Sequence, residues 1–113
     1  RRHQEVNLKR GMPTVEQALG RLERKLEQSR KEGYRVLTLI HGYGSSGKGG
    51  KIRTECRKLL GHMSSEKKIN QLIFGEEFRK RTGPGKALLH RFPQLERDCS
   101  SDFSNPGVTI VVL

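Results

Sequence analysis

Residues 36–51 of this chain read VLTLIHGYGSSGKGGK, an apolar run that leads into a glycine-rich segment ending among lysines. The apolar run predicts a strand over residues 34–40, and its near-continuous apolar character is typical of a central strand covered on both faces. The segment that follows, residues 52–60, has apolar side chains at helical spacing, and we expect this helix to end at Gly61. The stretch therefore predicts a strand, a glycine loop and a helix in succession.

The glycine loop has the features of an anion site. Glycines allow positive φ and let backbone N–H groups approach a ligand, and the first turn of a helix adds unpaired donors and the positive end of its dipole. Basic side chains surround the loop, so we expect it to hold a phosphate. The alternative is a flexible surface loop whose glycines only end the strand. The expected phosphate-binding residues are Lys9, Arg10, Gly42, Tyr43, Gly44, Ser45, Ser46, Gly47, Lys48, Lys51 and Arg53.

Tyr43 has two interpretations. An exposed ring beside lysines is a surface on which unpaired bases stack. Alternatively, the ring folds back on the edge of the sheet.

Residues 42–48, GYGSSGK, also satisfy the P-loop pattern G-x-x-x-x-G-K between a strand and a helix. The next residue is Gly49, where a P-loop needs a serine or threonine to hold Mg²⁺. P-loop-like nucleotide binding is therefore a minor alternative, and it uses the same backbone donors for phosphate.

Flanking segments complete an α/β pattern. Residues 5–9 alternate apolar and polar and predict a strand, and residues 69–74 and 107–113 predict two more. Thr14 and Gln17 form a capping box that opens a helix with an apolar stripe. The order is strand, helix, strand, helix, strand, strand, with crossover lengths suited to parallel pairing of the first two strands.

Residues 75–106 separate the last two strands. They are basic at Arg79-Lys80-Arg81, are interrupted by Gly83-Pro84-Gly85 and carry a short helical pattern at 86–92. A structureless loop of this length is uncommon in a compact domain. We expect a partly helical excursion or a mobile lid.

The length of 113 residues predicts one domain over residues 1–113. Its formal net charge of +11 suggests a polyanionic partner, nucleic acid rather than a membrane, although basic charge that serves only solubility is the alternative. No apolar run approaches the ~20 residues that cross a bilayer. The two cysteines cannot form a disulfide framework, so we expect a reducing, cytoplasmic setting, with Cys56 in the core and Cys99 in a polar loop.

Three blocks in this order resemble the small MutS-related (Smr) domain family. Residues 6–12, VNLKRGM, precede a helix and lie where the family has L-D-x-H-G. Residues 36–44, VLTLIHGYG, end in the family's H-G-x-G and lead into a basic helix. Residues 106–113, PGVTIVVL, are similar to the family's closing G-x-T-x-V-x-L strand.

The resemblance implies an α/β fold, a two-layer sandwich with a mixed four-stranded sheet and helices packed on it, with 75–106 as an insertion before the last strand. It also implies binding of DNA or RNA, branched or structured forms included, and several members of the family are endonucleases. The family occurs as standalone proteins, which this chain resembles, and as C-terminal domains.

The chain departs from the family where L-D-x-H carries its acidic residue and histidine. Asn7 and Lys9 occupy those positions, or Leu8 and Arg10 if the alignment shifts by one. Lysine favours phosphate, so binding is expected, whereas family-type cleavage by these residues is not. His41, at the end of the central strand, is the candidate catalytic residue, as proton acceptor or phosphate partner. The alternative is a histidine that shapes the loop.

The remaining expectations concern metals and partners. No metal cluster and no cofactor is evident in the sequence, and a divalent metal is expected only for a nuclease. An interaction module on a nucleic-acid machine such as the ribosome is the competing function. Arg79, Lys80 and Arg81 would extend the basic surface.

Overall fold

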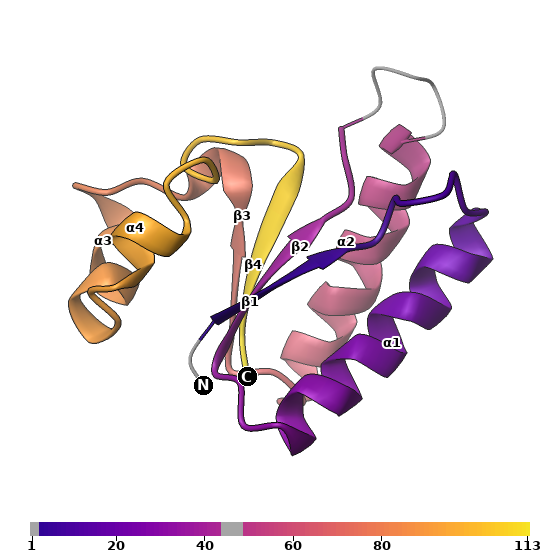
Figure 1. Ribbon diagram of the computed structural model, residues 1–113, viewed down its shortest axis with the longest axis horizontal. Helices are drawn as coiled ribbons and strands as arrows, with labels where there is room; N and C mark the ends of the chain where they lie inside the picture. Colours follow the sequence, from indigo (N-terminus) through magenta and orange to yellow (C-terminus); the bar gives the residue numbers. More distant parts are fainter. Residues whose placement is uncertain (1–2, 44–48) are drawn as a thin grey trace.

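A computed structural model describes residues 3–43 and 49–113 (Figure 1). Its elements follow one another in the order that the sequence predicts, with additional short helices before the last strand. They are β1 (His3–Asn7), α1 (Val15–Lys31), β2 (Val36–Ile40), α2 (Gly49–Ser65), β3 (Gln71–Phe74), the 3-10 helix η1 (Gly75–Glu77), α3 (Gly83–Arg91), α4 (Leu95–Asp98) and β4 (Val108–Val112).

The strands form a mixed four-stranded sheet in the order β1-β2-β4-β3. β1 and β2 are parallel, as their helical crossover requires. β4 is antiparallel to both neighbours. β2 and β4 are therefore the central strands, and all of β4 and most of β2 are buried. This confirms the central position predicted for residues 34–40.

β1 ends two residues before the sequence predicts. The side-chain oxygen of Asn7 accepts a hydrogen bond from the backbone N–H of Lys9 at 3.0 Å, which turns the chain out of the sheet. Lys9 is therefore exposed beyond the strand.

α1 and α2 cover one face of the sheet (Figure 1). The capping box at Thr14 and Gln17 is present, with both reciprocal bonds formed. Cys56 lies in this core, as predicted, and burial raises the pKa of its thiol to about 11. The buried members of the core are Val6, Leu8, Ala18, Leu22, Leu26, Leu37, Leu39, Ile52, Cys56, Leu60, Ile69 and Val111.

The prediction that the second helix ends at Gly61 is wrong, because α2 continues to Ser65. A glycine inside a helix costs about 1 kcal/mol relative to alanine. Leu60 is fully buried and Met63 packs against the same core, so apolar contacts on either side of Gly61 offset that cost.

The insertion, residues 75–106, is a partly helical excursion over the second face of the sheet (Figure 1). Gly83 and Pro84 do not interrupt a helix but begin α3, where the missing N–H of proline costs nothing. Gly75 starts the insertion, and only glycine fits there because a Cβ would lie 1.9 Å from the Asn105 carbonyl oxygen.

A second core forms beneath the insertion, and it changes the interpretation of Cys99. The sequence predicts this residue in a polar loop, but it is fully buried, and burial raises the pKa of its thiol to about 12. Thr38 on β2 links the sheet to the insertion, since its hydroxyl donates to Asp102 Oδ2 at 3.4 Å. The buried apolar members are Val36, Ile73, Phe78, Leu88, Phe92, Leu95, Cys99, Ile110 and Val112.

None of the helices in the described ranges combines the length and the apolar character needed to cross a bilayer.

Candidate functional site

The polar residues of interest gather at the end of the sheet where β1 and β2 finish. The backbone N–H groups of His41 and Gly42 both donate to the Gly107 carbonyl oxygen, at 3.1 and 3.0 Å. The chain leaving β2 is thereby held against the chain entering β4. Because the Gly42 N–H donates to Gly107, it is not free to bind the phosphate that the sequence predicts at this residue.

His41 is fully buried and engages both ring nitrogens. Its Nδ1 lies 2.7 Å from the Gly42 carbonyl oxygen, and because a carbonyl only accepts, Nδ1 carries the proton. Nε2 therefore accepts from the Thr109 hydroxyl at 2.8 Å. Burial lowers the pKa of His41 to about 4, and the positive charges of Arg57 and Arg53 act in the same direction. The ring is neutral at pH 7, and this geometry corresponds to a histidine that shapes the loop.

Arg57 connects this histidine to the insertion. Its Nε donates to Thr109 Oγ1 at 3.0 Å, so one hydroxyl donates to His41 and accepts from Arg57. The two terminal nitrogens of Arg57 each donate to a carboxylate oxygen of Glu76 at 2.7 Å, and the guanidinium lies 4.2 Å from the Phe74 ring centroid. Only 10% of the Arg57 side chain is exposed.

Glu76 also accepts from Arg53 at 2.8 Å. The bonds from Arg57, followed by the charges of both arginines, lower the pKa of Glu76 to about 2. The carboxylate is therefore ionised, and it neutralises part of the charge that the sequence assigned to phosphate binding. Arg53 retains 29% side-chain exposure but has an internal partner.

Other predicted residues remain exposed. Lys9, Arg10 and Lys51 are exposed, and none of them forms an ion pair with another described residue. Tyr43 is 59% exposed, and one side of its ring lies against Gly107, where a Cβ would be 3.3 Å from Tyr43 Cδ1. We call Lys9, Arg10, Tyr43 and Lys51 the exit edge.

The fold brings Lys9, after β1, next to Gly42, after β2. The Lys9 side chain crosses Gly42, whose missing Cβ would lie 3.4 Å from Lys9 Cδ and 3.9 Å from Nζ. Gly42 has a φ of 75°, a conformation that favours glycine. The predicted phosphate-binding residues Gly44, Ser45, Ser46, Gly47 and Lys48 lie outside the described residues.

A hollow of about 370 Å³ lies between β1 and α1, next to the exit edge. Arg10, Arg21 and Lys25 contribute its basic side chains, and Arg21 donates to the carbonyl oxygens of Leu8 and Arg10 at 3.3 and 3.0 Å. Sequence reasoning did not single out Arg21 or Lys25 for binding. Their i, i+4 spacing was the signal that both would face the same neighbour.

Sequence reasoning also missed the partners of His41. It did not connect Glu76, Arg57 or Thr109 with this histidine. No sequence signal joins residues from a helix, the insertion and the last strand, because their contact depends on the sheet order. In the described part of the chain, no three His, Cys, Asp or Glu side chains are arranged to hold a metal ion.

Comparison with known proteins agrees with this architecture. The family model described as the Smr domain matches residues 9–91. The crystal structure of the Smr domain of Thermus thermophilus MutS2 is similar, with a TM-score of 0.55 and 23% sequence identity, covering 100% of this chain and 98% of that chain. The structural likeness shows the fold alone. No curated protein matched the sequence.

Proposed function

This chain belongs to the Smr domain family, and from that premise we propose that it binds DNA or RNA through phosphates held at the exit edge. Lys9, Arg10 and Lys51 contact the sugar–phosphate backbone of the nucleic acid. Such contacts supply affinity without distinguishing base sequences. Tyr43 offers a ring for an unpaired base. The hollow beside Arg21 and Lys25, which the Glu5 carboxylate also lines, adjoins this surface along α1.

One observation carries this proposal: the cations of the exit edge are exposed and have no acidic partner among the described residues. In a chain with a net charge of +11, such side chains attract polyanions and release their counterions on binding. The arginines next to them are already paired with Glu76, so we assign the binding to the exposed set.

The buried network has a different role in this proposal. His41, Thr109, Arg57 and Glu76 fix the chain after β2, which carries Tyr43 and lies beneath the Lys9 side chain at Gly42. Because both nitrogens of His41 are engaged and its pKa is about 4, we assign this residue a positioning role in the proposal in place of acid–base catalysis.

The proposal is tested by fluorescence anisotropy with single-stranded and duplex DNA and RNA over a range of salt concentrations. We expect log K to fall linearly with log salt. The variant Lys9→Ala/Arg10→Ala/Lys51→Ala should bind more weakly, with a slope shallower by about 3, roughly one unit for each phosphate that the variant no longer neutralises. Incubation of the same probes with and without divalent metal reports cleavage, the enzymatic alternative.

The matched control is Arg24→Ala/Lys31→Ala/Lys58→Ala, which removes the same charge from exposed positions on the outer sides of α1 and α2. Its slope should change by less than about 1. Equal slopes for the two variants would show that net charge, rather than the exit edge, attracts the nucleic acid. Absence of binding to every probe at low salt would contradict the proposal. Sedimentation with ribosomes without affinity for free RNA would favour the interaction module.

A further inference from the structure

β1 lies at one edge of the sheet, where it pairs with β2 alone among the described strands. The backbone N–H of Leu8 donates to the Ile40 carbonyl oxygen at 2.8 Å. In a parallel pair, alternate residues of one strand bond to the same neighbour, so the even-numbered residues of β1 direct their backbone groups to β2. The N–H and C=O groups of Glu5 and Asn7 therefore point away from the sheet.

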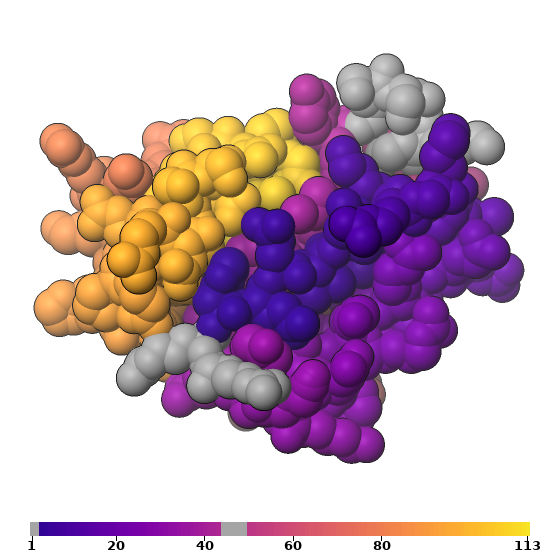
Figure 2. Space-filling model, in the orientation of Figure 1, coloured from indigo at the N-terminus to yellow at the C-terminus, as the bar shows by residue number. Residues whose placement is uncertain are grey.

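These outward groups are unpaired in the described part of the chain. No backbone group of a described turn or loop bonds to the N–H or C=O of Glu5 or Asn7, and no described side chain does so either. Figure 2 shows the β1 region (indigo) at the surface between the insertion (orange) and α1 (purple). An exposed strand edge of this kind is a template for another extended chain.

Two cations of α1 lie beside the open edge. Arg21 and Lys25 line the hollow of about 370 Å³ together with residues of β1. Arg21 is fixed by its bonds to the Leu8 and Arg10 carbonyl oxygens. Neither cation forms an ion pair with another described residue. We call Arg21, Lys25 and the outward backbone groups of β1 the β1 edge.

The spacing of the two cations matches alternate residues of an added strand. Ser29 bonds to Gln4 at the start of β1 and Arg21 bonds to the Leu8 carbonyl oxygen beyond its end, so α1 runs antiparallel alongside the strand. Residues four apart on a helix are separated by about 6 Å along its axis, and residues two apart on a strand by about 6.6 Å. Two acidic side chains at alternate positions of an added strand therefore reach Arg21 and Lys25 together.

The backbone chemistry of the β1 edge distinguishes a peptide from a nucleic acid. The edge offers N–H donors and C=O acceptors, and an extended peptide supplies the complement of both. Phosphate oxygens only accept, so they leave the carbonyl oxygens of Glu5 and Asn7 without a donor. The positive side chains add a preference for acidic residues in the peptide.

A second copy of this chain is a less suitable occupant. Antiparallel pairing of β1 with itself about Glu5 places two carboxylates directly opposite each other, which is destabilising. The formal net charge of +11 also makes two copies repel each other. Charge therefore favours a partner of opposite sign.

We infer that the β1 edge binds an acidic, extended segment of a partner protein as an additional strand of the sheet. Acidic residues at alternate positions of the segment contact Arg21 and Lys25. The residues between them are neutral, because they lie on the face that carries Glu5, which alternates with the buried Val6. This site goes beyond nucleic-acid binding at the exit edge and does not depend on it.

The test uses labelled peptides of about eight residues, longer than β1 itself. One peptide alternates glutamate with threonine, and a control of the same composition groups the glutamates at one end. Fluorescence anisotropy at about 0.1 M salt measures their affinity for the unmodified protein. The alternating peptide should bind about tenfold or more tightly than the control, because only its carboxylates have the spacing of Arg21 and Lys25.

Glu5→Pro and Glu5→Ala form the matched pair of variants. Proline removes the outward N–H and its ring blocks an approaching strand, while the bonds from β1 to β2 are kept. Glu5→Pro should bind the alternating peptide about tenfold or more weakly, whereas Glu5→Ala should bind it at least as tightly as the unmodified protein does. Both variants should bind nucleic acid alike. Circular dichroism and the urea midpoint report whether they are folded.

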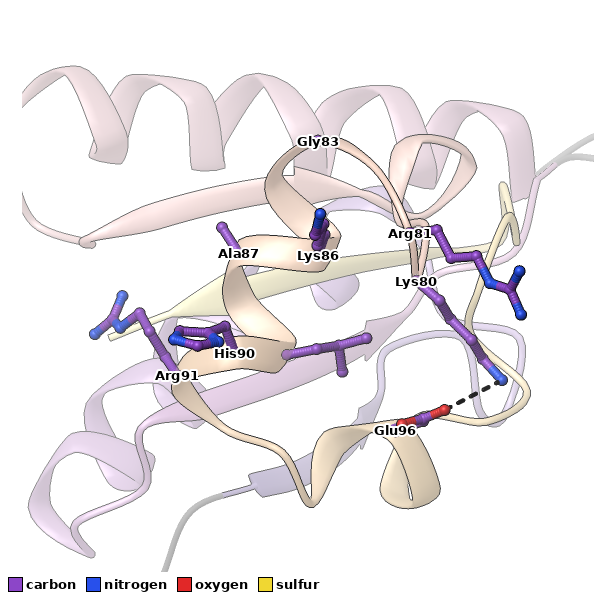
Figure 3. Close-up of a pocket in the computed structure, with 9 residues that line it drawn as sticks. Lys80, Arg81, Gly83, Lys86, Ala87, His90, Arg91 and Glu96 are labelled. Atoms are coloured by element: carbon purple, nitrogen blue, oxygen red, sulfur yellow. Dashed lines mark ion pairs between the residues drawn. The ribbon is translucent and has the colours of Figure 1, made fainter.

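The charge at the β1 edge is tested by Lys25→Glu, which should weaken binding of the alternating peptide about fivefold or more. Lys86→Glu is its control, because it makes the same change in net charge at another exposed position. Lys86 lines a separate hollow of about 750 Å³ along α3, together with Arg81 and Arg91 (Figure 3). The control should change the affinity by less than about twofold.

Methylated peptides test the backbone pairing without any change to the protein, and they apply even if Glu5→Pro does not fold. N-methylation of every second residue should abolish binding for one of the two alternating sets and preserve it for the other, because only alternate N–H groups of an added strand face β1. Loss in both sets, or in neither, would overturn the inference.

Other contrary outcomes identify a different occupant. Equal affinity for the alternating and grouped peptides, or no binding of either, would overturn the inference. Loss of nucleic-acid binding in Glu5→Pro but not in Glu5→Ala would assign the β1 edge to the nucleic acid. A dimer in sedimentation equilibrium that only Glu5→Pro dissociates would assign it to a second copy of the chain. Either result would also overturn the inference.

Discussion

Lys51 and Arg53 lie two residues apart at the start of α2, yet the fold uses their charges differently. Lys51 is exposed and forms no ion pair among the described residues, whereas Arg53 donates to Glu76 at 2.8 Å. The neighbouring Arg57 is bound still more completely, with two further bonds to the same carboxylate. A count of basic residues along the helix therefore overstates the charge available to a ligand.

The comparison separates residues that hold the binding surface in place from residues that contact the ligand. The paired arginines, with Thr109 and His41, hold the ends of β2, β4 and the insertion together. The exposed lysines depend on that frame for their positions but meet the ligand themselves. Substitutions in the first group should change stability, and those in the second group should change affinity.

The largest expected effect concerns His41. Its folded pKa of about 4 lies below the unfolded value of 6.5, so the unfolded chain binds the proton first as pH falls. Its contribution is therefore fully present above about pH 6.5 and is lost as pH falls toward about 4. The contribution of His41 to the free energy of unfolding is about 3 kcal/mol in total, and about 2 kcal/mol of it is lost between about pH 7 and pH 5.

Urea unfolding of the unmodified protein and of His41→Asn over this pH range measures that contribution. Asparagine keeps a side-chain donor but does not titrate. The difference in free energy of unfolding between the two should shrink as the pH is lowered. Parallel stability curves would show that His41 is not held buried and neutral.

A smaller effect is expected for Glu76→Gln. The change leaves Arg53 and Arg57 without a carboxylate and should cost about 1–2 kcal/mol, because the Glu76 side chain is 37% exposed and partly screened. The pKa of Glu76 is lowered from 4.5 to about 2, so its contribution is present above about pH 4.5 and lost toward about pH 2. Thermal unfolding at these pH values should show this loss in the unmodified protein only.

Glu76→Gln also tests whether the carboxylate keeps Arg53 from the ligand. Release of Arg53 should steepen the salt slope of nucleic-acid binding by about 1. If stability and slope both stay unchanged, Glu76 does not neutralise the arginines, and the comparison with Lys51 loses its basis.

The sequence predicted elements that depend on local signals. The capping box at Thr14 and the apolar runs of β2 and β4 each specify their own structure, and the parallel pairing of β1 and β2 follows from the helix between them. The family resemblance supplied the mixed four-stranded sheet, which the structure confirms.

Features that depend on distant contacts were not predictable in the same way. Gly61 would end an isolated helix, but packing of Leu60 carries α2 past it. Cys99 lies in a polar segment, yet it is buried because the insertion folds over the second face of the sheet.

Prediction of the candidate site from the sequence has the same limit. The exposed cations could be identified from composition and position, but the pairing of Arg53 with Glu76 joins residues 23 apart in sequence. The burial of His41 depends on Gly107 and Thr109, which enter with the last strand.

The most direct test of the account compares Lys51→Ala with Arg53→Ala, which remove one positive charge each from the same turn of the same helix. The measurement is the slope of log K against log salt for a nucleic-acid probe, with the urea midpoint recorded for both variants. We predict that Lys51→Ala makes the slope shallower by about 1 and leaves the midpoint unchanged. Arg53→Ala should lower the midpoint and leave the slope unchanged. A shallower slope for Arg53→Ala with no loss of stability would contradict the account.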